Sequence, residues 1–287
     1  LLKSQDELDN TRWKKYWCFD KMMTQSDIVD YLINIDKELN ETYEIYQSLL
    51  YSLKHNEYHL LEATLNEQHN NISEYMKISI KTLKSYLPHI KNTLSNPYHN
   101  ANHTLSMMYH ICCIYEESQK DDYEFKLDSE GLYILLVSAI FHDFNHSAGR
   151  FTDDINVSNA CKIMEDYFTR EFPNDIDTVE RIKEIVHDNI IATCYPYVIE
   201  DNKLNLYQRI LRECDILVSF SSDYFTQCAI GLKDELRIND WKLFLGNHIK
   251  FLMDSWKDMK LSYSLKLINE HQESLFNQIE NILSIIS

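Results

Sequence analysis

The feature that most restricts the fold of this chain is the scarcity of residues that interrupt helices. Only four glycines and four prolines occur in 287 residues. Most β-turns and chain reversals need these two residue types, so their scarcity favours long helices joined by short loops. Hydrophobic residues make up 44% of the chain, which is enough for a substantial core. We therefore predict an all-α fold.

The charge of the chain restricts its partners. Acidic residues outnumber basic ones, and the formal net charge is −17. Nucleic acids and anionic membranes attract basic surfaces, so we predict neither as a partner. No apolar stretch approaches the roughly twenty residues of a membrane span. The seven cysteines form no CxxC pair and indicate reduced thiols in a cytoplasmic protein. Because the chain starts at Leu1 without a methionine, we expect it to be a fragment.

Histidines cluster between residues 96 and 149. His99 and His103 are four positions apart, and so are His142 and His146. Side chains four apart lie on one face of a helix, so each segment can point two imidazoles into one space.

Two carboxylates have sequence environments that predict burial. Asp143 follows the apolar run 132–141, which is typical of a buried helix, and Asp215 lies on an apolar stripe of the segment 209–218. A buried carboxylate needs a cation or dense hydrogen bonding. A metal ion satisfies this need at both positions; the alternative for Asp215 is an ion pair with Arg212.

These residues make a candidate metal site of His103, His142, Asp143 and Asp215. Two imidazoles and two carboxylates suit zinc, manganese, iron or magnesium, and they leave coordination positions open, as catalytic sites do. A His-Asp dipeptide alone is a weak signal. The second one, His187-Asp188, lacks partners at useful spacing, and we predict no site there.

These segments resemble the HD-domain phosphohydrolases, and most of all the class I cyclic nucleotide phosphodiesterases. That family carries PYHNxxH, HDxxHPG followed by SN, ILAT and CAD segments. The counterparts are residues 97–103, 142–149, 158–159, 190–193 and 214–215. The resemblance covers roughly residues 90–255, and it departs at Ser147-Ala148, where the family has Pro-Gly.

The resemblance implies a compact multi-helix bundle with a buried di-metal site. Its reaction is hydrolysis of a 3′,5′-cyclic nucleotide to the nucleoside 5′-monophosphate. It implies two divalent ions, zinc plus magnesium or manganese, the second sharing Asp143. His99 would be the general acid, and His146 would hydrogen-bond a water on the second ion. Asp153 and Asp154 either ligate that ion or form a loop and helix cap.

The resemblance also suggests residues that contact the substrate. In the family a glutamine, and three residues later a phenylalanine, contact the nucleobase. His248 and Phe251 have this spacing, with His248 in place of the glutamine. This leaves the base open between cyclic AMP, cyclic GMP and others; alternatively, both are core residues. We expect Asn100 to be a further substrate contact and His110 to be a core histidine bonded to a backbone carbonyl.

We expect one structural domain with three parts. Residues 1–95 form a helical cap or a regulatory or dimerising segment, so a homodimer stays open. Residues 96–255 form the metallophosphohydrolase core, and residues 256–287 a closing helix. Two other functions stay open: hydrolysis of linear nucleoside mono- or triphosphates, and a catalytically silent module that binds a nucleotide or a protein.

Overall fold

A computed structural model of the chain describes residues 78–79, 81–82, 85, 96–174, 176–220 and 225–286. The chain divides into a unit Leu1–Asn40 and a unit Glu41–Ser287, and all described residues belong to the second. The prediction of a cap at residues 1–95 therefore lies largely outside the described residues. Those described between 78 and 85 are helical, and Ile78 is part of the core.

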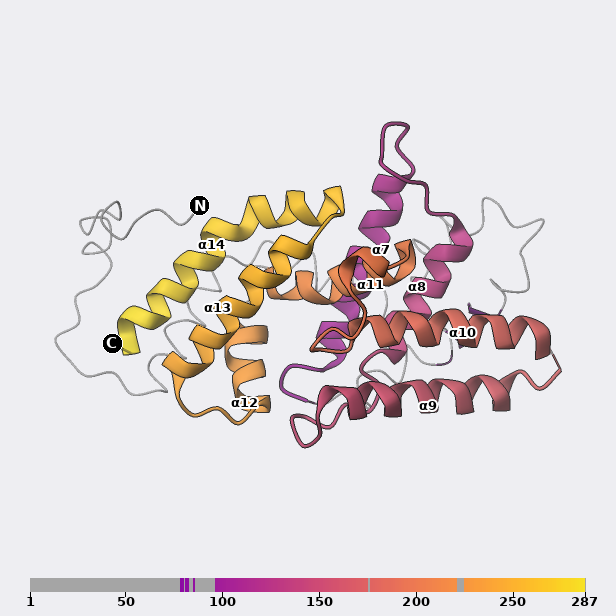
Figure 1. The fold of residues 1–287 in the computed structure, drawn as a ribbon, viewed down its shortest axis with the longest axis horizontal. Helices are drawn as coiled ribbons and strands as arrows, with labels where there is room; N and C mark the ends of the chain where they lie inside the picture. The colour runs from indigo at the N-terminus through magenta and orange to yellow at the C-terminus, as the bar shows by residue number, and fades with distance from the viewer. Residues whose placement is uncertain are drawn as a thin grey trace. The chain divides into compact units, whose positions relative to one another are not determined.

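Every regular element in the described ranges is helical, which confirms the all-α prediction (Figure 1). The longer helices are α7 (Ala101–Ser118), α8 (Ser129–Phe141), α9 (Asp153–Glu171), α10 (Ile176–Thr193), α11 (Leu206–Leu217), α13 (Trp241–Asp258) and α14 (Ser262–Ile286). The shorter ones are η3 (Asp201–Lys203), η4 (Val218–Phe220), the π-helix η5 (Phe225–Leu232) and α12 (Lys233–Glu235). None of these helices combines the length and apolar character that crossing a membrane requires.

Helix α8 lies at the centre of the core. Residues 131–142 are all buried, as the uninterrupted apolar run predicts. The helix begins where Asp128 accepts a hydrogen bond from the backbone N–H of Gly131 at 2.7 Å. It packs against α7, α9, α10 and α11, so the residues that follow its last turn emerge among these helices.

Helix α11 connects this core to the C-terminal pair α13 and α14. Asn205 and Gln208 form a capping box that starts α11. Further along, the buried Glu213 accepts hydrogen bonds from the backbone N–H groups of Lys260 at 2.9 Å and Leu261 at 3.3 Å. These bonds hold the connection between α13 and α14 against α11. The closing helix expected within residues 256–287 is α14.

Candidate functional site

Two imidazoles meet where the start of α7 lies beside the end of α8. His103 lies in the first turn of α7, and His142 follows α8 directly; their Nε2 atoms are 3.2 Å apart. His142 Nδ1 lies 2.8 Å from the carbonyl oxygen of Ala139, to which it donates a hydrogen bond. This bond sets the tautomer in which the Nε2 lone pair of His142 points at the shared space.

Both predicted carboxylates reach the same space. Asp143 Oδ2 lies 2.8 Å from His142 Nε2 and 3.2 Å from His103 Nε2. Asp215, which comes from α11, places Oδ1 at 3.0 Å from His103 Nε2. The structure thus brings together all four residues that the sequence singled out, from three helices.

The charges of this group are strongly coupled. Burial lowers the pKa of His103, but its contacts with Asp143 and Asp215 outweigh burial and raise the pKa to about 10. Burial raises the pKa of Asp143, but the nearby histidines hold it well below its usual range. In this arrangement a proton on His103 offsets one of the two negative charges of Asp143 and Asp215.

A divalent cation fits the same donors. Oδ2 of Asp143 is buried and has no well-aligned hydrogen bond from the described residues. One ligand atom from each of His103, His142 and Asp215 lies within 4.8 Å of the other two. A cation between two imidazole nitrogens and two carboxylates replaces the proton as the balancing charge. The ligand chemistry therefore suits the expected metal.

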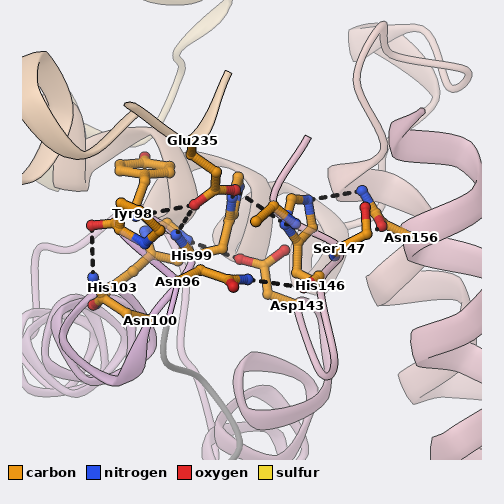
Figure 2. A network of polar contacts seen from close by, with 12 residues as sticks. Asn96, Tyr98, His99, Asn100, His103, Asp143, His146, Ser147, Asn156 and Glu235 are labelled. Carbon is orange, nitrogen blue, oxygen red and sulfur yellow. Dashed lines mark hydrogen bonds and ion pairs between the residues drawn. The ribbon is translucent and has the colours of Figure 1, made fainter. Parts of the chain in front are cut away.

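A second group lies beside the first (Figure 2). Glu235, at the end of α12, is 3% exposed, and its Oε1 contacts His99 Nδ1 and lies 3.1 Å from His146 Nδ1. Its Oε2 accepts hydrogen bonds from the backbone N–H groups of Tyr98 and His99, each at 3.0 Å. One carboxylate thus holds two histidines that are 47 positions apart in the chain.

Glu235 is ionised in this setting. Burial raises its pKa, but hydrogen bonds with His146 and His99 outweigh burial and hold the pKa well below its usual range. The sequence analysis missed this residue. A weak signal was present, because Glu235 follows the short apolar stretch 228–232, which resembles the pattern that singled out Asp143. The π-helix in that run shifts the register, so helical periodicity does not predict burial here.

Both ring nitrogens of His146 have protein neighbours. Nδ1 faces Glu235, while Nε2 lies 2.9 Å from the side-chain amide of Asn156 and 3.9 Å from Asp153 Oδ1. Burial lowers the pKa of His146, but Asp153 and Glu235 raise it to about 9. Asp153 also accepts a hydrogen bond from the backbone N–H of Tyr195 at 2.6 Å, whereas Asp154 is exposed.

Residues 142–149 fold tightly over these groups. Asn145, Ala148 and Gly149 all have positive φ angles, of 61°, 54° and 68°. A Cβ at Gly149 would lie 2.6 Å from the carbonyl oxygen of Glu235, so only glycine permits this close approach. The loop and the Glu235 segment are therefore packed backbone to backbone.

The two groups open onto a cavity of about 520 Å³. His99, Asp143, His146, Asp215 and Glu235 line its polar side. The remaining wall is rich in aromatic rings: Tyr98, Phe151, Tyr195, Tyr197, Phe244 and Phe251.

The residues expected to contact substrate differ in their location. His248 and Phe251 both line the cavity, with His248 stacked between Phe244 and Phe251 at ring distances of 5.5 and 5.9 Å. Burial lowers the pKa of His248 to about 4, so the ring is neutral at pH 7. Asn100 instead starts α7: its side chain donates to the Pro97 carbonyl oxygen and accepts from the backbone N–H of His103.

Other expectations are corrected by the structure. Arg212 does not pair with Asp215; its Nε donates to the carbonyl oxygen of Ala192 at 2.7 Å, because the side chain points toward the end of α10. His110 is buried as predicted, but its partner is the hydroxyl of Tyr263 at 3.0 Å rather than a carbonyl. His187 Nδ1 lies 3.4 Å from Asp188 Oδ1, and the absence of a site at this pair stays a prediction.

Comparisons with known proteins add little to this geometry. No family model and no solved structure matches the chain. Over 80 residues the chain is 36% identical to a protein of Lactococcus lactis subsp. lactis described as an ATP-dependent protease. That match covers 27% of this chain and 25% of the relative, so the chain spans about a quarter of the relative's length. An overlap of this extent does not show a shared family.

Proposed function

We propose that this chain is a metal-dependent phosphodiesterase that hydrolyses a 3′,5′-cyclic nucleotide to the nucleoside 5′-monophosphate. The observation that carries the proposal is the convergence of His103, His142, Asp143 and Asp215 beside the His99–Glu235 pair. Both groups face one cavity, through Asp143 and Asp215 on one side and His99 and Glu235 on the other. A cavity of this volume suits a small ligand.

His103, His142, Asp143 and Asp215 would hold the proposed divalent ions, zinc plus magnesium or manganese, and Asp143 would be available to both. When bound, divalent ions activate water at neutral pH and neutralise charge on phosphoryl oxygens. The chain as a whole is acidic, with a formal net charge of −17, so bound ions would also supply the local positive charge that attracts an anionic substrate.

His99 delivers the proton to the leaving oxygen. Its Nδ1 is engaged by Glu235, which fixes the orientation of the ring and leaves Nε2, on the opposite edge, to carry the proton. His146 orients Glu235 from the other side, since its own nitrogens face Glu235 and Asn156. Glu235 is thus a positioning residue for the proton donor.

The test is a panel of cyclic and linear nucleotides, incubated with the chain and added manganese, magnesium or zinc, with products identified chemically. We expect 5′-monophosphates from a cyclic substrate and about two ions per chain. Activity on linear mono- or triphosphates alone would favour a different phosphohydrolase with the same ligand set. Less than one ion per chain together with no turnover would instead favour a catalytically silent module that binds a nucleotide or a protein.

A further inference from the structure

The segment 194–200, between α10 and η3, forms part of the cavity wall. Tyr195 and Tyr197 both line the cavity. The Tyr195 ring packs edge-on against Tyr197 at 5.4 Å and against Phe251 of α13 at 5.2 Å. The hydroxyl of Tyr197 also lies close to Ser255 of α13. The segment therefore continues the aromatic face of α13 around the cavity.

One buried arginine holds this segment on α11. Arg212 is 5% exposed; its Nε donates to Ala192 at 2.7 Å and its Nη2 to the carbonyl oxygen of Ile199 at 3.0 Å. The guanidinium carbon lies 4.1 Å from the centre of the Tyr197 ring. Arg212 thus binds the backbone on both sides of the two tyrosines and packs on one of them.

The far end of the segment is anchored to the same helix. Arg209 donates to the side chain and to the carbonyl oxygen of Asp201, both at 2.7 Å. Asp215 follows Arg212 by three positions, which is about one helical turn. A single rigid helix therefore carries a proposed metal ligand and both anchors of the aromatic segment.

We propose that Tyr195 and Tyr197 form the wall on which the base of the substrate packs, and that Arg212 is the positioning residue that holds this wall at a set distance from Asp215. The inference rests on the proposed function and adds the place of the base. Aromatic faces stack on any nucleobase. A wall held in place loses little entropy on binding, so Arg212 acts on KM more than on kcat.

The test uses Arg212→Met and Tyr197→Leu in the metal-loaded full chain. With a cyclic nucleotide that the wild type hydrolyses, we expect each variant to raise KM about tenfold or more and to change kcat little. Inhibition by a nucleoside 5′-monophosphate should weaken by a similar factor. Inhibition by inorganic phosphate and the metal content should stay unchanged, because neither involves the base.

Arg170→Met is the matched control. Its guanidinium lies 6.0 Å from the ring of Tyr167, but neither residue lines the cavity, so KM should not change. The KM of the double variant should be no higher than that of the more impaired single variant, because both substitutions disrupt the same aromatic wall.

An unchanged KM in Tyr197→Leu would contradict the proposal that the base packs on this wall. Equal loss of monophosphate and phosphate inhibition, or loss of metal, in Arg212→Met would show a purely structural role and overturn the positioning. If Arg212→Met does not fold, Arg212→Lys and Tyr197→Leu provide the same comparison. If the wild type hydrolyses no nucleotide, the proposed function fails. The affinities of the variants for a nucleoside 5′-monophosphate and for inorganic phosphate, measured by direct binding, still test whether the base packs on this wall.

Discussion

At the scale of single residues, the unusual element is a carboxylate shared by two histidines. Glu235 contacts the ring nitrogens of His99 and His146 and also accepts two backbone N–H groups. Four donors around one carboxylate leave it little freedom, and the rings that it contacts are held in turn. The four proposed ion ligands do not include His99 or Glu235, for which we propose a role in proton transfer, and this difference leads to two predictions.

Replacing His99 should remove turnover and leave the metal. His99 is not one of the four proposed ligands His103, His142, Asp143 and Asp215, so His99→Ala is expected to keep the metal content of the wild type. Loss of a general acid costs about 10²–10⁴-fold in rate. Metal analysis and kcat measure the two effects separately, with the exposed His187→Ala as the control. Full activity in His99→Ala would remove it from the acid role.

Glu235→Gln tests the positioning role at nearly constant shape. The amide keeps one oxygen for the backbone N–H groups of Tyr98 and His99, but it loses the negative charge that faces both imidazoles. We expect kcat to fall by about 10–100-fold, as for the partners that orient catalytic ligands, and the metal content to stay the same. A pH–rate profile identical to that of the wild type would contradict this role.

At the scale of elements, the site depends on how one loop meets one short helix. Residues 142–149 carry His142, Asp143 and His146 and end at Gly149, which packs on the backbone of Glu235. Asn96 adds a further bond to the loop, donating to the carbonyl oxygen of His146 at 2.8 Å. This contact aligns His142 and Asp143, two of the proposed metal ligands, with the His99–Glu235 pair.

Gly149→Ala should disturb both stability and turnover. The methyl group would meet the Glu235 carbonyl oxygen at 2.6 Å, and alanine at a φ of 68° costs about 1–2 kcal/mol by itself. Gly246→Ala is the matched control: no atom lies within 4 Å of its added Cβ in α13, so it should stabilise by up to about 1 kcal/mol. Urea unfolding measures the stability of the two variants, and kcat measures their turnover. Equal stability of Gly149→Ala and Gly246→Ala would contradict the close contact at Gly149.

At the scale of the whole molecule, the proposed ion connects helices that are distant in sequence. Its ligands come from α7, from the turn after α8 and from α11. An ion bound only by the folded chain shifts unfolding by mass action.

Removing metal should therefore lower stability as well as activity. At an ion concentration a hundred times the dissociation constant, the bound ion contributes about 2.7 kcal/mol. We expect a chelator to lower the melting temperature and abolish turnover, with both recovered when the metal returns. His103→Ala, which lacks a ligand, should show a much smaller chelator effect; an equal effect would place the ion elsewhere.

Acid should destabilise the protein partly through His110. Burial, together with nearby His271, lowers the pKa of His110 to about 4, below the value of about 6.5 in the unfolded chain. Between these two pKa values the unfolded state binds more protons than the folded state. The stability that depends on a neutral His110 is therefore fully present above pH 6.5 and is lost as the pH falls toward 4. The loss between pH 7 and pH 5 is about 2 kcal/mol.

His110→Gln should unfold with a flatter pH dependence than the wild type over this range. Urea midpoints at pH 7 and pH 5 measure the difference, with the exposed His187→Gln as the control. Parallel pH dependence in His110→Gln and the wild type would exclude the contribution.

The all-α class, the buried helix α8 and the segments that carry the four proposed ligands could be predicted from the sequence. Each depends on local rules: the spacing of histidines along a helix, the scarcity of glycine and proline, and the cost of a carboxylate beside an apolar run. Tertiary structure decided what these rules do not reach. Glu235 meets His99 across 136 positions, and Arg212 turns from Asp215 to the 194–200 segment. Such contacts depend on how helices pack, and no local periodicity encodes that arrangement.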